Sequence, residues 1–349
     1  MDLKFCTNCV MDGSDPNLVL DEKGICNHCH SAQKQLRAID LEKKDLPEVI
    51  AKIKKDGEGK EYDCVVGLSG GVDSSATLVA AVKQFGLRPL CFTMDNGYND
   101  PRADENILRL VESLKVRLYR YVLNIGKFKS LQAAFLRAGL VNVEIPTDHV
   151  LMAASFEIAN LYNIKYILSG GNVVTESIMP HAWSYPAKDL RHIKSVYKWA
   201  TGKKLTDLPT CGLFKWNVYR WLRGVRTIYL LDYLDYNRLE SEAMLIRDYG
   251  FQSTGEKHEE SVFTRWFQSF YLFQKFGIDK RKAHYSSLIN AGLMTRSEAL
   301  AKLAEQPVYP EFKIEKKVMG YPKKSHYDFK TDERLFNFIS KVVRTLKKL

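Results

Sequence analysis

The chain has 349 residues, 45% of them hydrophobic, which is enough for roughly two globular domains. It contains no repeat, no low-complexity segment and no apolar run near the roughly 18 residues of a membrane helix. Its first residues lack the apolar core of a signal peptide, so we expect a cytoplasmic protein without a membrane role. The net charge of +11 does not by itself indicate nucleic-acid binding, because residues 313–349 contribute +7, from eleven Lys or Arg against four Asp or Glu.

Four cysteines near the N-terminus have the spacing of a metal site. Cys6 and Cys9 form one Cys-x-x-Cys pair, and Cys26 and Cys29 form a second pair 16 residues later. This spacing predicts a zinc ribbon over residues 1–35. Four protein ligands complete a tetrahedral site, so we expect Zn²⁺ to be structural rather than catalytic. An iron–sulfur cluster held by the same ligands is the alternative.

After a charged helical stretch over residues 32–55, an α/β pattern begins with the most informative segment of the chain. A strand over residues 63–68 leads into a glycine-containing loop, and a helix over residues 73–85 follows. The loop, called the phosphate loop below, consists of Ser69, Gly70, Gly71, Val72, Asp73, Ser74 and Ser75. Backbone N–H groups and a helix N-terminus converge on an anion in such a turn, which predicts phosphate binding. No Gly-Lys-Ser/Thr follows, which excludes the Walker loop.

Strands and helices alternate over the next hundred residues, which predicts a doubly wound, mostly parallel sheet. Strands are expected over residues 89–94, 118–123 and 166–168, and helices over 101–114, 128–137 and 148–162. The end of the second strand would flank the nucleotide, with the Met94 backbone at the base and Asp95 near the ribose or the substrate. The alternative for Met94 is a place in the hydrophobic core.

A second loop follows the strand that ends at residue 168 and is called the glycine–asparagine loop below. It contains Gly170, Gly171 and Asn172, and Glu176 follows four residues later. The carboxyl ends of parallel strands meet at one sheet edge, so this loop should face the phosphate loop. The segment resembles the magnesium-binding loop of NAD synthetases, although the glutamate falls one residue later here. The resemblance implies that Asp73 and Glu176 share a Mg²⁺. The alternative for Glu176 is a carboxylate that only stabilises a helix start.

Beyond residue 177 the pattern is helical and rich in aromatic residues. One helix is expected over residues 259–276, and its apolar stripe at helical spacing indicates core packing rather than base stacking. The stripe consists of Val262, Phe263, Trp266, Phe267, Phe270 and Phe273. Thr295 and Glu298 predict a helix with a capping box. We therefore expect a nucleotide-binding domain over 36–200, a helical substrate or partner region over 201–310 and a basic tail over 311–349.

Four sets of residues together resemble a known enzyme family. The phosphate loop has the SGGxDS pattern of the PP-loop of ATP pyrophosphatases. Two further stretches are Lys-His-Glu-Glu-Ser from Lys257, with Arg265 in the same stretch, and Asp-Lys-Arg from Asp279. With the cysteine pairs, they make the chain similar to the N-acetyl sugar amidotransferases of surface-polysaccharide biosynthesis, including lipopolysaccharide O-antigen. The similarity extends to about residue 303.

The resemblance implies an ATP-dependent conversion of the acetamido group of a nucleotide-linked N-acetyl sugar into an acetamidino group. AMP would be transferred to the amide oxygen, and ammonia would displace it, with AMP and pyrophosphate as products. The phosphate loop with Gly170 and Gly171 would bind ATP. The implied catalytic residues are Ser69, Asp73, Lys257, His258 and Arg265, and the implied substrate contacts are Asp95, Asn172, Lys280, Arg281 and His284. The alternative is a solvated helix face for the cations and a structural role for each histidine.

The ammonia source is expected to lie outside this chain. Residue 2 is Asp2, so no N-terminal cysteine nucleophile is present, and Cys64, Cys91 and Cys211 lie outside any glutaminase motif. The resemblance implies a separate glutaminase subunit, together with a barrel subunit as a further member. We expect the zinc ribbon or the basic tail of this chain to dock the glutaminase.

Two other functions compete with this one. A tRNA-thiolating enzyme could combine the same motifs, but no further cysteine pair and no RNA-binding module is evident. A zinc-ribbon interaction protein with an inactive nucleotide fold is the non-enzymatic alternative, and the intact phosphate loop argues against it.

Overall fold

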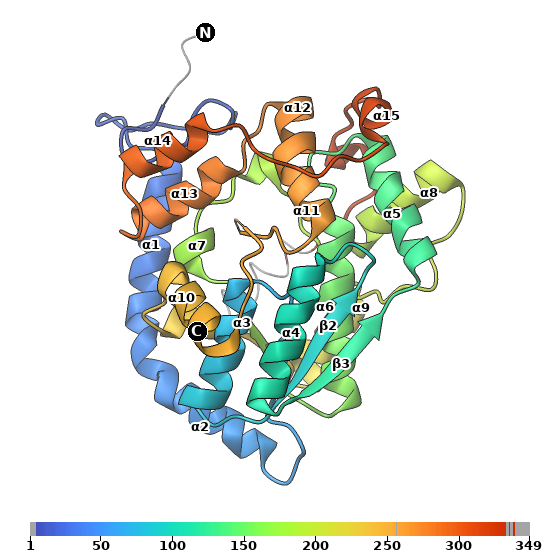
Figure 1. Ribbon diagram of the computed structural model, residues 1–349. Coiled ribbons are helices and arrows are strands. Elements are labelled where there is room, and N and C mark those ends of the chain that lie inside the picture. Colours follow the sequence, from blue (N-terminus) through green and yellow to red (C-terminus); the bar gives the residue numbers. More distant parts are fainter. Residues whose placement is uncertain (1–4, 256, 333–334, 336–337, 339–349) are drawn as a thin grey trace.

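The computed structural model describes residues 5–255, 257–332, 335 and 338, and a parallel β-sheet lies at its centre (Figure 1). The strands are β1 (Cys64–Gly67), β2 (Pro89–Asp95), β3 (Arg117–Val122), β4 (Tyr166–Ser169) and β5 (Arg226–Tyr229), in the spatial order β3-β2-β1-β4-β5. All four strand pairs are parallel. The order reverses between β1 and β4, so the predicted doubly wound sheet is confirmed and the phosphate loop follows a strand at the switch point.

Apolar side chains cover both faces of the sheet. Helices α2 (Leu46–Gly57), α3 (Val72–Val79), α4 (Pro101–Leu114) and α10 (Arg238–Tyr249) pack on one face, and α6 (Ile145–Leu161) packs on the other. In β1, Cys64 and Val66 belong to the first of these cores and Val65 to the second, and all three are fully buried. The strand therefore lies within a sheet covered on both sides.

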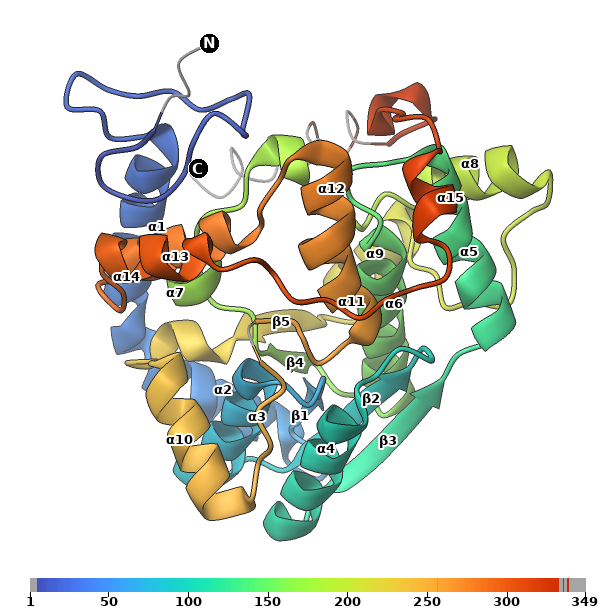
Figure 2. The same ribbon diagram turned by 45° about the horizontal axis from the view of Figure 1, so that its top comes forward.

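The other helices surround the carboxyl edge of the sheet and its flanks (Figure 2). They are α1 (Asn27–Glu42), α5 (Ile125–Ala138), α7 (Val173–Glu176), α8 (Leu190–Thr201), α9 (Leu213–Asn217), α11 (Val262–Trp266), α12 (Leu272–Phe276), α13 (Arg281–Asn290), α14 (Arg296–Ala304) and α15 (Glu315–Met319). Helix α13 packs against α7, α1 and α14. These contacts join the C-terminal region to the helix that follows the glycine–asparagine loop and to the N-terminal segment. In the described part of the chain, no helix has the length and apolar character needed to cross a bilayer.

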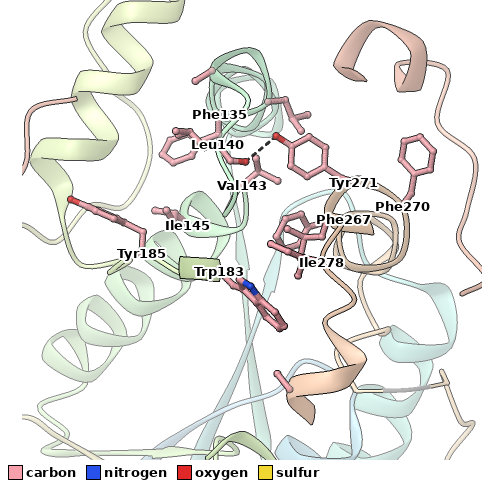
Figure 3. Packing of buried hydrophobic residues seen from close by; sticks show 14 of the residues in the cluster. Phe135, Leu140, Val143, Ile145, Trp183, Tyr185, Phe267, Phe270, Tyr271 and Ile278 are labelled. Carbon is pink, nitrogen blue, oxygen red and sulfur yellow. Dashed lines mark hydrogen bonds between the residues drawn. The ribbon is translucent and has the colours of Figure 1, made fainter. Parts of the chain in front are cut away.

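A hydrophobic core holds the C-terminal helices over the sheet edge (Figure 3). Phe267 and Tyr271 pack with Leu140, Val143 and Ile145, which lie in the segment that leads into α6. The hydroxyl of Tyr271 donates a hydrogen bond to the Leu140 carbonyl at 2.9 Å. The start of α6 is therefore fixed against the C-terminal region.

The predicted helix over residues 259–276 begins later than expected. It starts at Val262, because the Ser261 hydroxyl accepts from the Thr264 N–H at 3.3 Å and caps the helix. A π-helical turn over Phe267–Tyr271 joins α11 to α12. The predicted apolar stripe is largely buried, and the capping box at Thr295 is confirmed.

Strand β5 lies in a stretch for which the sequence predicts only helices. It pairs with β4 from Tyr166↔Arg226 to Ser169↔Tyr229. The sheet therefore continues past residue 200, where the nucleotide-binding domain was expected to end. The described part of the predicted basic tail includes α15 and a short turn of helix over His326–Asp328, whereas residues 333–334, 336–337 and 339–349 lie outside the described residues.

Candidate active site

The phosphate loop connects β1 to α3, and a close backbone neighbour requires glycine at one of its positions. Gly70 has φ +80°, and a Cβ there would lie 2.3 Å from the carbonyl oxygen of Ala103. A Cβ at Gly71 would meet the carboxylate of Glu260 at 3.0 Å. Side chains larger than hydrogen are therefore excluded at Gly70, and the first N–H groups of α3 remain directed at the loop.

The glycine–asparagine loop lies directly against the phosphate loop, as expected for two loops at one sheet edge. A Cβ at Gly170 would approach the Ser74 nitrogen to 2.7 Å. The amide of Asn172 donates to Asp73 Oδ2 at 3.3 Å, and its oxygen accepts from the Thr175 N–H at 2.9 Å. Asn172 therefore links Asp73 to the start of α7 while its own side chain stays buried.

Lys257 joins these loops to the C-terminal region. Its Nζ lies 2.6 Å from Asp73 Oδ2 and 2.9 Å from Glu176 Oε1, and it also bonds to the Thr175 hydroxyl. Desolvation opposes the positive charge of this buried lysine, but Asp73 and Glu176 outweigh it and raise the pKa of Lys257. Lys257, Asp73 and Glu176, called the lysine–carboxylate cluster below, form a charged centre between three segments.

The lysine segment is held by backbone pairing with the chain that follows β2. The N–H of Asp100 donates to the Glu260 carbonyl at 2.9 Å, and the N–H of Val262 donates to the Tyr98 carbonyl at 2.8 Å. These bonds explain how residues far apart in sequence reach the phosphate loop. His258, next to Lys257, has φ +66° and places its Nε2 3.5 Å from Glu176 Oε1.

The arrangement of carboxylates fits a divalent cation. Asp73 and Glu176 both lie within 3 Å of one positively charged atom, Lys257 Nζ, so their oxygens already enclose a position for a cation. Carboxylate oxygens are the ligands that Mg²⁺ prefers, and this ion takes its remaining ligands from water and phosphate. The two carboxylates could therefore hold Mg²⁺ if Lys257 moves aside.

Tyr236 is a site residue that the sequence does not reveal. Its hydroxyl donates to Asp73 Oδ1, on the side of the carboxylate opposite Lys257. Desolvation and then the charge of Asp73 raise the pKa of Tyr236, so the phenol remains a donor. No motif surrounds this tyrosine, and its approach to Asp73 depends on the unpredicted strand β5 and on the turn that follows it.

Several predicted site residues also have structural partners. The guanidinium of Arg265 bonds to Asp100 at 3.2 Å, and Arg281 bonds to Asp279 at 2.8 Å and to carbonyls at the end of α14. The side chain of Met94 lies in a core with Leu123, Phe128 and Val150. Asp95 accepts from the Gly97 N–H at 3.1 Å. The ring of His284 lies 5.6 Å from that of His258, next to Lys257, and the charge of Glu176 acts on both Lys280 and His284.

The four N-terminal cysteines converge as predicted. All four are buried, and their Sγ atoms lie within 4.8 Å of one another. The Cys6–Cys29 and Cys9–Cys26 sulfur pairs are 3.8 Å apart, and Cys26 and Cys29 are 3.6 Å apart. A tetrahedral Zn²⁺ with Zn–S bonds of about 2.3 Å requires sulfur separations of about 3.8 Å. The cysteines therefore fit a single metal ion of this size.

Comparison with known families separates the chain into two parts. Residues 48–208 match the NAD synthase family, and residues 260–325 match the family described as LPS biosynthesis protein WbpG-like, C-terminal domain. The chain thus combines a PP-loop domain of the NAD synthase type with a WbpG-like C-terminal domain. This combination is consistent with the N-acetyl sugar amidotransferase family that the sequence resembles, and it supports an ATP-using enzyme.

Individual relatives are more distant. The uncharacterized protein MJ1599 of Methanocaldococcus jannaschii is 29% identical over 169 residues, which are 47% of this chain and 58% of that protein. The NH₃-dependent NAD synthetase of Campylobacter jejuni has 18% identity and a TM-score of 0.33, over 77% of this chain and 97% of that one. The U34-tRNA thiolase NcsA of Methanococcus maripaludis, with its [4Fe-4S] cluster, has 14% identity and a TM-score of 0.36, over 93% and 98%. TM-scores this low carry no inference about activity.

Proposed function

We propose that this protein is an AMP-forming amidotransferase that converts the acetamido group of a nucleotide-linked N-acetyl sugar into an acetamidino group for surface-polysaccharide synthesis. The observation that carries the proposal is the contact of Lys257 with Asp73 and Glu176. It joins the nucleotide loop of a PP-loop domain to the segment that leads into the WbpG-like region. A site built from both parts suits a reaction between ATP and a sugar.

The chain's own residues would prepare the α-phosphate for attack by an amide oxygen. The phosphate loop and the start of α3 would hold the β- and γ-phosphates through backbone N–H groups. Lys257 would turn from its carboxylates to the phosphates and stabilise the pyrophosphate as it leaves. Asp73 and Glu176 would then hold Mg²⁺, which supplies positive charge to the phosphate oxygens. Asn172 and Tyr236 would keep Asp73 in position.

Three further assignments belong to the same proposal. The N-terminal cysteines would hold a structural Zn²⁺, which the close sulfur spacing supports. Ammonia would come from a separate glutaminase subunit, with a barrel subunit as a further member of the complex. The substrate would lie beside Lys280 and His284, between the sheet edge and α13.

One route to tRNA thiolation uses an accessible thiol near the nucleotide. Outside the N-terminal set, Cys64, Cys91 and Cys211 are all buried. Burial raises the pKa of Cys91 to about 12 and that of Cys211 to about 11, so neither is a ready thiolate at neutral pH. These properties favour nitrogen transfer over a sulfur transfer that uses these cysteines.

The decisive experiment incubates the full chain with ATP, ammonium chloride and a panel of nucleotide-linked N-acetyl sugars. Mass spectrometry follows the replacement of one sugar oxygen by NH, and chromatography identifies the adenine nucleotide released. We expect an acetamidino sugar together with AMP. Formation of ADP, or AMP formation that depends on tRNA and not on a sugar, would contradict the proposal.

A further inference from the structure

Two carboxylates that the sequence does not single out lie at the start of α6. Glu144 is the residue that precedes the helix, and Asp148 lies in its first turn, where the helix dipole favours negative charge. Residues four apart in a helix share one face, with Cβ atoms about 5–6 Å apart. Because α6 leads into β4, it begins at the same sheet edge as the phosphate loop. We call Glu144 and Asp148 the acidic pair.

Glu144 is held in place by buried neighbours, and only one of its two carboxylate oxygens accepts a hydrogen bond from the described residues. Its neighbours Val143 and Ile145 are both fully buried in the core beneath α11 and α12. The Thr264 hydroxyl donates to Glu144 Oε2 at 2.7 Å. Glu144 is only 9% exposed, and its Oε1 has no hydrogen-bond partner among the described residues. A buried acceptor without a donor is costly, so this oxygen indicates a ligand that supplies one.

Asp148 lies one helical turn beyond Glu144 and borders the same space, which we call the recess. Its side chain is accessible to solvent, yet desolvation by the surrounding protein raises its pKa to about 6. Lys280, His258 and Glu176 all act on Asp148 electrostatically, so the recess borders the lysine–carboxylate cluster.

The groups around the recess leave an excess of negative charge. Besides the acidic pair, the carboxylates whose charge acts on it are Glu260 and Glu176, so four carboxylates face the cationic side chains of Lys280 and His258. His284 completes the wall, and desolvation followed by the charge of Lys280 lowers its pKa well below the usual value, so the ring is neutral. Its buried Nε2 also has no partner in the described part of the chain. A small cation with several N–H donors matches this set of acceptors.

We propose that the acidic pair binds ammonium beside the nucleotide site and removes its proton before nitrogen transfer. This inference rests on the proposed amidotransferase function. Ammonium gives one proton to a carboxylate of the pair, and the freed nitrogen lone pair forms a C–N bond to the activated amide carbon. The C–O bond to the adenylate breaks, and its electrons leave with AMP. All three hydrogens of ammonia stay in the amidinium product, so atoms and charge balance.

The raised pKa values suit this role. Desolvation and then the charge of Asp148 raise the pKa of Glu144 to about 7, and that of Asp148 is raised to about 6. A base whose pKa lies near the operating pH accepts a proton and releases it again without a large penalty. An ordinary exposed carboxylate would be too weak a base for ammonium.

The first test uses Glu144→Gln and Asp148→Asn in the full chain, with ammonium chloride as the nitrogen source. We expect the KM for ammonium to rise about tenfold or more, as for loss of a hydrogen bond to a charged group, with the KM for ATP little changed. Hydroxylamine is largely unprotonated at neutral pH, so it should restore nitrogen transfer by Asp148→Asn. The matched control is Glu157→Gln on the same helix, because Glu157 pairs with Lys215 at 2.7 Å, away from the recess.

A second test separates this site from the proposed function. Thermal unfolding of the wild type is compared in ammonium chloride and in sodium chloride at equal ionic strength. We expect stabilisation by ammonium that both variants lose and the control keeps, even if no sugar in the panel reacts. An unchanged ammonium KM in folded variants, or stabilisation by sodium or Mg²⁺ equal to that by ammonium, would overturn the assignment. Failure of all sugars with wild type, together with ammonium-specific stabilisation, would count against the function alone.

Discussion

Lys257 Nζ lies 2.6 Å from Asp73 Oδ2, although 184 residues separate the two in sequence. The pair is nearly enclosed, with exposed fractions of 8% and 16% for the two side chains. A buried lysine between two carboxylates satisfies their charge when no nucleotide is bound. The same lysine must release them when a metal and phosphates arrive, which makes its replacement informative.

We expect Lys257→Met to abolish AMP formation, because the leaving pyrophosphate loses its nearest cation. It should also destabilise the fold by about 3–5 kcal/mol, since Asp73 and Glu176 would be left facing each other without a counter-charge. Pyrophosphate release and chemical denaturation measure the two effects. Lys257→Arg should remain impaired, because a planar guanidinium does not reproduce the three bonds of an ammonium group. Wild-type turnover in either variant would contradict this role.

Asp73→Asn should eliminate AMP formation while the protein stays folded. The amide keeps the size of the side chain and can still bond to Tyr236, but it lacks the charge that holds a divalent cation. Circular dichroism and AMP release measured over a range of Mg²⁺ concentrations provide the check. Substantial activity that still saturates with Mg²⁺ would show that the metal is held elsewhere.

Tyr236→Phe tests the hydrogen bond that positions Asp73. Loss of one bond to a charged group corresponds to about 1.5–3 kcal/mol, so we expect a fall in turnover of about tenfold or more with little change in the KM for the sugar. Tyr249→Phe, in the next helix along the chain, serves as the control and should behave as wild type. Equal effects of both substitutions would indicate a general loss of stability instead.

The ionisation of Glu144 should make the free energy of unfolding decrease as the pH rises. Its folded pKa is raised from 4.5 to about 7, so the native state holds this proton more tightly than the unfolded chain does. The stabilisation that this tighter proton binding gives the folded state is present at low pH and is lost as the pH rises from about 4.5 to 7. We therefore expect Glu144→Gln to match the wild type near pH 4.5 and to be the more stable protein at pH 8. Urea denaturation at the two pH values measures the difference, and a variant less stable at pH 8 would refute it.

Removal of metal should affect the N-terminal segment first. Elemental analysis is expected to find one zinc per chain, and Cys26→Ser should lower both the zinc content and the midpoint of thermal unfolding. Cys211→Ala is the control, because this cysteine lies in a different core and should leave the zinc content unchanged. Iron with sulfide in place of zinc would support the cluster alternative.

The features that the sequence predicts correctly are local ones. The phosphate loop, the cysteine pairs and strands β1 to β4 are each specified by residues close together in the chain, so spacing and periodicity reveal them. Strand β5 is short, and Ile228 is its only residue that is not exposed, so the sequence shows no alternation of apolar and polar residues there. It becomes a strand because it pairs with β4. Tyr236, Glu144 and Asp148 acquire their roles from neighbours more than a hundred residues away. No spacing rule reports such contacts.

The N-terminal cysteine segment rests on α13 and α14, and this has a consequence for synthesis on the ribosome. The Val10 N–H bonds to the Ser286 hydroxyl at 3.3 Å, and the Arg296 guanidinium bonds to the Cys9 carbonyl at 3.0 Å. The cysteine segment emerges well before α13 and α14, so it reaches its final packing only after those helices have been made. Metal bound early would keep four reactive thiols protected during that interval. The segment folded around this ion would then offer a preformed surface against which α13, the helix that carries His284, can pack.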